Sequence, residues 1–215
     1  MNELIFFSHI LILIGFIFLA LRYVKYGLVA LCTFQVILAN LFVTKQITLF
    51  SFTVTPTDAY ALGCFLSLNL LQEFYGKEEA KKVMNLNLFL LVFFAAMACI
   101  QIFYIPSPFD DKHLAFQSIL SPSFRIFFSS IICFALTQKF DFHLFSFLRK
   151  HLSLTKAMTL SLIVTQAFDT IAFSLLALQG IVHSIFDIML VSYLIKMIAL
   201  ITMMPFTKFA KRVTI

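Results

Sequence analysis

Residues 86–105 read LNLFLLVFFAAMACIQIFYI, a stretch without a single charged side chain. A helix of about 20 mostly apolar residues spans the hydrocarbon core of a bilayer, because it satisfies its own backbone hydrogen bonds. The stretch also lacks the alternation of apolar and polar residues that is typical of a membrane β-strand. It therefore predicts a transmembrane helix.

The rest of the chain repeats this pattern. Of its 215 residues, 61% are hydrophobic, only 12% are charged and 29 are Phe. A soluble domain cannot hide so much apolar surface in one core, because the surface that faces water needs polar side chains. We therefore predict an all-α integral membrane protein, a single transmembrane domain built as a bundle of about seven helices. The expected spans are about 4–21, 27–44, 57–75, 86–105, 119–138, 157–178 and 184–206.

The first hydrophobic stretch has an alternative interpretation as a cleaved signal peptide. It contains no basic residue before the apolar run and no small-x-small cleavage site before Arg22, both of which a signal peptide normally has. We therefore interpret it as a membrane span.

The basic residues indicate the orientation of the bundle. Twelve of the sixteen lysines and arginines fall in alternate loops or in the C-terminal tail. By the positive-inside rule these segments face the cytoplasm, which places the N-terminus outside and requires an odd number of spans. This sorting accounts for the net charge of +6 without a nucleic-acid partner, and it predicts a multi-pass protein of the cell (inner) membrane with a cytoplasmic C-terminus. The twelve are Arg22, Lys25, Lys77, Lys81, Lys82, Lys139, Arg149, Lys150, Lys156, Lys208, Lys211 and Arg212.

Motifs for nucleotides, metals and common hydrolytic chemistry are missing from the sequence. The chain has only five Gly, and it contains no P-loop, GxSxG or HExxH pattern. Its four cysteines fall in different predicted spans without CxxC spacing. We expect no cofactor, no metal and no enzymatic activity. Two alternatives stay open: an intramembrane enzyme that uses Glu73 or Asp169 as acid or base, and a membrane scaffold.

Polar side chains inside the third predicted span form one functional signal. Such side chains cost at least a few kcal/mol when they face lipid, so we expect them to face the interior of the bundle. Asn69, Gln72 and Glu73 share one face by helical spacing. Glu73 also lies near the cytoplasmic end, where an interfacial pair with Lys77 or Lys81 is the alternative.

The sixth and seventh predicted spans carry a second group of polar and aromatic side chains. Gln166, Asp169 and Phe173 share a face of the sixth span, and Tyr193 and Lys196 are three residues apart in the seventh. Asp169 lies in mid-span, so a substrate contact is one reading and a structural ion pair with Lys196 or Arg125 is the other. Asn40 adds a polar side chain from the second span.

These residues also carry a resemblance. The stretch from about Asn40 to Arg212 resembles the queuosine precursor transporter family, within the vitamin-uptake-transporter group. The family has an Asp where this chain has Asn69 and a small residue where it has Gln72. The first predicted span has no counterpart in the six-helix members, so the expected bundle is six family-like helices plus an extra N-terminal one. The matching positions, in chain order, are Asn40, Lys45, Asn69 to Gly76, Lys81, Lys82, Arg125, Ile126, Asp141, Phe145, Leu148, Arg149, Gln166, Asp169, Thr170, Phe173, Tyr193, Lys196, Pro205 and Phe206.

The resemblance implies import of a 7-deazaguanine such as queuine, preQ1 or preQ0, for salvage in tRNA modification. Carboxylates accept the N–H groups of a guanine-like edge, amides suit its carbonyl, and an aromatic side chain can stack on its face. The family is also compared with substrate-binding subunits of energy-coupling-factor importers, which remains an alternative. Expected partners are the small-molecule substrate and membrane lipid, and a homodimer is left open. The candidate substrate-binding residues are Glu73, Asp169, Gln166, Asn69, Gln72, Asn40, Lys196, Tyr193 and Phe173.

Overall fold

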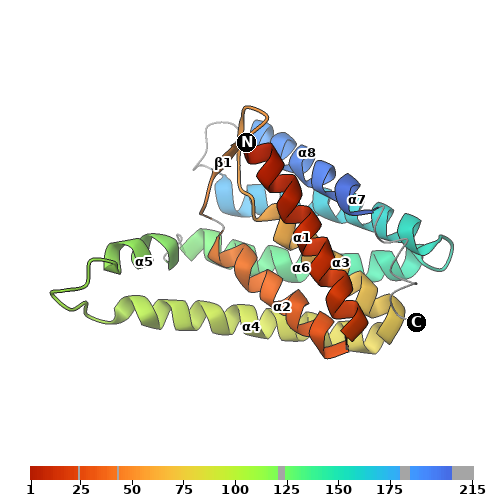
Figure 1. The fold of residues 1–215 in the computed structure, drawn as a ribbon, viewed down its shortest axis with the longest axis horizontal. Helices are drawn as coiled ribbons and strands as arrows, with labels where there is room; N and C mark the ends of the chain where they lie inside the picture. Colours follow the sequence, from red (N-terminus) through yellow and green to blue (C-terminus); the bar gives the residue numbers. More distant parts are fainter. Residues whose placement is uncertain (24, 43, 121–123, 180–184, 205–215) are drawn as a thin grey trace.

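The computed structural model describes residues 1–23, 25–42, 44–120, 124–179 and 185–204. These residues form an all-α membrane protein whose only strands, within the described ranges, make one short hairpin (Figure 1). The predicted fold class is confirmed. The helices are α1 (Asn2–Tyr23), α2 (Lys25–Leu41), α3 (Asp58–Tyr75), α4 (Lys77–Phe103), α5 (His113–Leu120), α6 (Phe124–Leu148), α7 (Leu154–Phe173), the π-helical turn η1 (Ser174–Leu178) and α8 (Ile185–Met203). The antiparallel hairpin pairs β1 (Ile47–Leu49) with β2 (Phe52–Val54).

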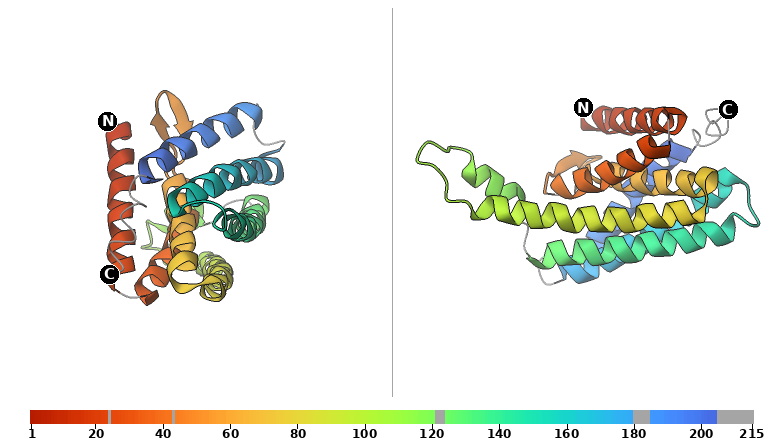
Figure 2. Two further views of the ribbon diagram at one scale, coloured as in Figure 1. Left: turned by 90° about the vertical axis from the view of Figure 1, so that its right-hand side faces the viewer. Right: turned by 90° about the horizontal axis from the view of Figure 1, so that it is seen from below.

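Helix α3 is the centre of the bundle. It contacts α1, α2, α4, α6, α7 and α8, and thirteen of its eighteen residues are buried. Figure 2, in the view along the long axis, shows α3 surrounded by these helices. A helix enclosed by protein has no stripe that faces lipid, so it can carry Asp58, Asn69, Gln72 and Glu73 at membrane depth.

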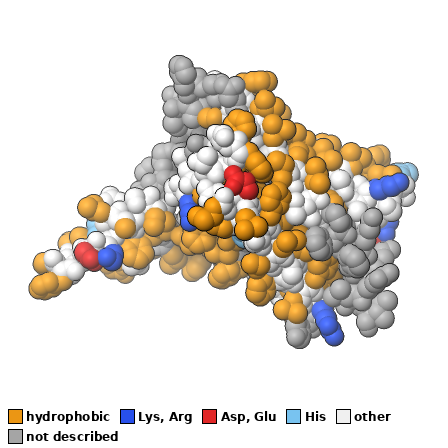
Figure 3. Space-filling model, turned by 45° about the horizontal axis from the view of Figure 1, so that its top comes forward, with side chains coloured by type: hydrophobic (Ala, Val, Ile, Leu, Met, Phe, Trp, Pro, Cys, Tyr) orange, Lys and Arg blue, Asp and Glu red, His pale blue; other side chains and the backbone are white. Residues whose placement is uncertain are grey.

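The surrounding helices present apolar side chains to the outside. Phe89, Phe93 and Ile100 lie on one face of α4 and are 65%, 53% and 48% exposed. Figure 3 shows many hydrophobic side chains and few charged ones on the described part of the surface. Within the described residues, four helical segments are long and apolar enough to cross a membrane, and two shorter ones are apolar. The four are Asn2–Arg22, Lys77–Phe103, Phe128–Leu148 and Leu154–Ala177, and the two are Tyr26–Leu41 and Ile188–Met203.

Two helices are longer than the hydropathy of their sequences suggests. α4 begins at Lys77, directly after Gly76, whose φ of +92° favours glycine and separates α3 from α4. α6 continues past residue 138 to Leu148 because the polar side chains in its second half, Gln138 and Asp141, are fully buried against other helices. The mean hydropathy of the sequence falls at such buried polar residues, so a span predicted from hydropathy ends there although the helix continues.

The longer helices α1, α2, α3, α4, α6 and α7 alternate in direction along the chain, so most helix ends gather at two ends of the molecule. Figure 1 shows the C-terminal ends of α1, α3 and α6 and the N-terminal ends of α2, α4 and α7 on the right-hand side. The α4–α5 connection projects at the opposite end. The β1–β2 hairpin is hydrogen-bonded to the start of α1. Asn2 donates a hydrogen bond to the Thr48 carbonyl, and Glu3 accepts one from the Phe50 N–H.

Candidate functional site

Buried and half-buried polar side chains gather along the seam between α3, α6 and α7, three helices that pack against one another, and α8 adds Lys196. They follow α3 in three layers, from Asp58 at its start to Glu73 near its end. We name these layers the ion cluster, the middle tier and the end clamp. The ion cluster is Asp58, Thr137, Asp169, Thr170 and Lys196; the middle tier is Asn69, Gln138, Asp141, Ser161 and Thr165; the end clamp is Gln72, Glu73, Ser146 and Arg149.

In the ion cluster one ammonium group, that of Lys196, forms ion pairs with two carboxylates. Lys196 Nζ lies 2.7 Å from Asp169 Oδ2 and 3.8 Å from Asp58 Oδ1. The ammonium also donates a hydrogen bond to the Thr170 hydroxyl, and the Thr137 hydroxyl donates one to the other oxygen of Asp169. The Lys196 side chain is only 6% exposed. Mutual pairing offsets the cost of burying these charges, so the ion-pair reading of Asp169 holds in this conformation.

The other candidate substrate-binding residues of α7 and α8 lie in different surroundings. Gln166 is fully buried, and neither of its amide atoms has a hydrogen-bond partner among the described residues. The Tyr193 hydroxyl donates to the Ile163 carbonyl at 3.4 Å, which joins α8 to the backbone of α7. Phe173 is half-buried at the last position of α7. The side chain of Arg125, the alternative partner of Asp169, lies outside the described part of the structure.

In the end clamp Glu73 forms a two-point ion pair. Arg149, directly after α6, donates to the two carboxylate oxygens through Nε at 2.7 Å and Nη2 at 2.6 Å. Pairing with Glu73 raises the pKa of the Arg149 guanidinium, so the group stays fully charged. Glu73 is therefore ion-paired, as one reading of the sequence had it, although its partner is neither Lys77 nor Lys81.

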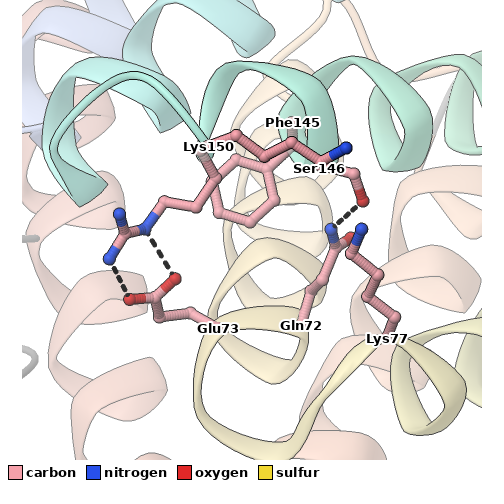
Figure 4. Close-up of a pocket in the computed structure, with 7 residues that line it drawn as sticks. Gln72, Glu73, Lys77, Phe145, Ser146 and Lys150 are labelled. Carbon is pink, nitrogen blue, oxygen red and sulfur yellow. Dashed lines mark hydrogen bonds and ion pairs between the residues drawn. The ribbon is translucent and has the colours of Figure 1, made fainter.

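A cavity of about 210 Å³ lies beside the end clamp. Figure 4 shows Gln72 donating to the Ser146 hydroxyl, at 2.5 Å, next to the Glu73 pair. Lys77, Phe145 and Lys150 complete the lining. A second cavity, of about 450 Å³ between α7 and α8, is mostly apolar and holds none of the predicted site residues.

The middle tier is centred on Asp141, whose side chain is fully buried. Ser161 and Thr165 of α7 donate to its Oδ1 at 2.6 Å and 3.1 Å. Asn69 of α3 lies beside the same carboxylate. Gln138, one turn before Asp141 on α6, donates to the Cys64 thiol at 3.7 Å. The tier therefore joins three helices through polar contacts that no solvent reaches.

Sequence reasoning missed most of the middle tier as a site. Asp141 lies beyond the predicted limit of its span, so it was counted as a loop residue although it occupies a motif position of the resembled family. The signal that identifies it is helical spacing, because Gln138, Asp141 and Phe145 are three and four residues apart and all three are buried. Asn40, in contrast, was predicted as a site residue but donates to the Val36 carbonyl of its own helix.

Cys32, Cys64 and Asn87 form a further buried group between α2, α3 and α4. The two thiol sulfurs are 3.6 Å apart, and both cysteines are free. The Asn87 amide donates toward both sulfurs and accepts from the Thr33 hydroxyl at 2.8 Å. No group of three His, Cys, Asp or Glu side chains suited to a metal ion occurs within the described ranges.

Comparison with known proteins finds a relative that covers most of this chain. The chain is 27% identical over 194 residues to a protein of Bacillus subtilis (strain 168) named "Probable queuosine precursor transporter". The match covers 87% of this chain and 85% of that protein. No solved structure matches the chain at a comparable level of significance.

The family assignment follows from a match over most of the chain. Residues 59–210 match the sequence model of the family described as "Putative vitamin uptake transporter". The match begins in α3 and includes all three polar layers except Asp58. The chain belongs to this family of vitamin uptake transporters, and it is a multi-pass membrane protein that transports and is not an enzyme.

Proposed function

We propose that this protein imports a queuosine precursor, a 7-deazaguanine base such as queuine, preQ1 or preQ0. The observation that carries the proposal is the seam itself, where buried amides and a carboxylate keep unfilled hydrogen-bonding atoms inside an apolar bundle. Such atoms suit a planar base that offers N–H and carbonyl groups along its edges. The name of the Bacillus subtilis relative supports the same class of substrate.

The seam suits alternating access to a central site. Along α3 the middle tier lies between two ion-paired layers, the ion cluster and the end clamp. Each of these layers would close one side of the tier, and opening one at a time would expose the tier to one side of the membrane. Glu73 and Asp169 would then act on the substrate path and release their partners as it opens.

The distribution of basic residues supports an orientation for this path. The helix ends that gather on the right of Figure 1, together with the loops between them, carry most of the basic residues within the described ranges. By the positive-inside rule this end faces the cytoplasm, so the end clamp and its cavity would open inward and the N-terminus would lie outside. These basic residues are Arg22, Lys77, Lys81, Lys82, Arg149, Lys150 and Lys156.

Uptake of radiolabelled queuine and preQ1 into cells that express the protein tests the proposal. Glu73→Gln and Asp169→Asn keep the shape of each side chain and remove its charge, so we expect at least tenfold slower uptake at equal surface expression. Glu79→Gln is the matched control, because Glu79 pairs with Lys82 at the exposed start of α4 and lies off the seam. Undiminished uptake in both seam variants would reject their role on the path, and no uptake by the unmodified protein would reject the proposed function.

A further inference from the structure

The middle tier contains several buried polar atoms whose hydrogen bonds are unfilled. Asn69, Gln138 and Asp141 are each fully buried. Oδ2 of Asp141 and Oε1 of Gln138 have no hydrogen-bond partner among the described residues, and the Asn69 amide interacts with the Asp141 carboxylate beside it without a hydrogen bond of standard geometry. Buried polar atoms are normally paired, so a group of unpaired ones on neighbouring helices needs an explanation.

The chemistry of these atoms narrows the ligand that would fill them. Asp141 Oδ2 and Gln138 Oε1 accept hydrogen bonds, whereas the Asn69 amide offers an NH2 donor group and a carbonyl acceptor whichever way it is turned. A cation such as Na⁺ would fill only the oxygens, and the Asn69 NH2 group would gain no partner beyond its contact with Asp141. A neutral planar heterocycle with adjacent N–H groups and a carbonyl fills both kinds of atom.

Asp141 is held in one orientation by two hydroxyl groups of the neighbouring helix α7. Ser161 and Thr165 both donate to Oδ1, at 2.6 Å and 3.1 Å, so Oδ2 is the oxygen left for a ligand. Gln138 lies one turn away on the same face of α6 and adds a second acceptor. The Nε2 atom of Gln138 is already engaged by the Cys64 sulfur, which fixes Oε1 as its free end.

We propose that the middle tier is the substrate-binding site and that it reads the 2-amino-pyrimidinone edge of the base. In this arrangement Asp141 Oδ2 accepts from the exocyclic 2-amino group, Gln138 Oε1 accepts from the ring N1–H, and the Asn69 amide donates to the ring carbonyl. The inference rests on the proposed function and deepens it, because it assigns the recognising residues. Asp141 and Gln138 were not among the candidates that the sequence offered.

The tier is closed in this conformation, and the end clamp separates it from the cavity. Gln72 lines the cavity of about 210 Å³ and lies one helical turn from Asn69 on α3. Its hydrogen bond to Ser146 and the adjacent pair between Glu73 and Arg149 join α3 to the end of α6. Separation of these contacts would connect the cavity with the tier.

A binding experiment that combines protein variants with analogues of the base tests this assignment. The purified full chain is titrated with 7-deazaguanine and with 7-deazahypoxanthine, which lacks only the 2-amino group. The unmodified protein should bind 7-deazaguanine about ten- to hundredfold more tightly, the usual range for a hydrogen bond to a buried charge. In Asp141→Asn this preference should disappear, because the new amide presents a donor to the 2-amino group.

The matched control is Asn87→Ala, which removes a fully buried amide whose hydrogen bonds are internal. Loss of the preference in Asp141→Asn together with its retention in Asn87→Ala supports the assignment. An equal preference in both variants overturns it and leaves the proposed function standing. If the unmodified protein binds neither 7-deazaguanine nor queuine nor preQ1, the proposed function fails and the assignment falls with it.

Two further measurements cover the remaining outcomes. Gln138→Met keeps the length of the side chain and should weaken 7-deazaguanine binding about threefold to tenfold. An unchanged Kd in this variant overturns the assignment even if Asp141→Asn does not fold. Thermal unfolding is also compared in NaCl and KCl. The assignment is overturned if Na⁺ stabilises the unmodified protein but not Asp141→Asn, and if Asp141→Asn keeps its preference for 7-deazaguanine. The tier would then be a cation site.

Discussion

The ion cluster and the middle tier lie on the same seam, yet their polar atoms are used differently. In the ion cluster Lys196 contacts two carboxylates, and Asp169 receives a second hydrogen bond from Thr137. In the middle tier Asp141 is bonded at one oxygen only, and the amides around it have unfilled atoms. Burial alone therefore does not distinguish a structural polar residue from a ligand-binding one, whereas the number of its unpaired hydrogen-bonding atoms does. A filled cluster fixes helices, and an unfilled one is suited to a ligand.

Removal of the shared cation should have the largest effect. Lys196→Met leaves Asp58 and Asp169 buried without their counter-charge, so we expect the free energy of unfolding to fall by about 3–5 kcal/mol. Thermal unfolding in detergent can be followed with a thiol-reactive dye, because Cys32, Cys64 and Cys133 are buried and become reactive on unfolding. Lys82→Met, which removes an exposed pair with Glu79, should leave the Tm unchanged. Equal Tm values for the two variants would mean that the ion cluster does not fix the helices.

A smaller effect is expected at the end clamp. Arg149→Lys keeps the positive charge but loses the two-point geometry toward Glu73, and the side chains are partly exposed. We expect a loss of about 1 kcal/mol in the free energy of unfolding, measured by the same dye assay. Lys150→Ala is the control on the same cavity wall and should change the Tm less. A larger loss in the control would show that the clamp contributes little to joining α3 and α6.

The smallest effect should come from an unfilled amide. Gln166→Met replaces a fully buried side chain without hydrogen-bond partners by an apolar one of similar length, so stability should stay the same or rise by up to about 1 kcal/mol. Asn87→Leu, in contrast, breaks filled hydrogen bonds to Thr33 and Cys32 and should cost about 1–3 kcal/mol. If both variants lose the same stability, the unfilled amide is structural, and the distinction between the two kinds of buried polarity fails.

The fold class could be predicted from the sequence because a chain with 61% hydrophobic and 12% charged residues has too much apolar surface for a water-soluble domain. Long apolar runs such as that of α4 leave no other way to satisfy both the side chains and the backbone. The ends of the helices could not be predicted as well, because the hydropathy of the sequence falls wherever polar side chains point toward the interior of the bundle. The expected span ended at residue 138, although α6 continues to Leu148 and carries Asp141 to a fully buried position.

Part of the candidate site could also be predicted from the sequence. Asp169, Lys196 and Glu73 were identified because charges within apolar helices stand out in a sequence. Their partners were ambiguous, because any cation near one end of a helix is a possible neighbour of Glu73, and only the packed loop after α6 brings Arg149 within 2.7 Å. Gln166 was identified from its position within a span, but its lack of partners became visible only in the packed bundle.

Two properties of this chain follow from its amino-acid sequence alone: it folds as helices in a membrane, and the charged side chains within those helices turn inward. Both follow from the cost of exposing polar groups to hydrocarbon, which is a property of each segment taken alone. The packing of the helices, in contrast, sets which inward side chains pair with one another and which keep unpaired polar atoms. That outcome depends on the rotation and depth of α3, α6 and α7 relative to each other, because hydrogen bonds require contact within about 3 Å between residues that are far apart in the chain.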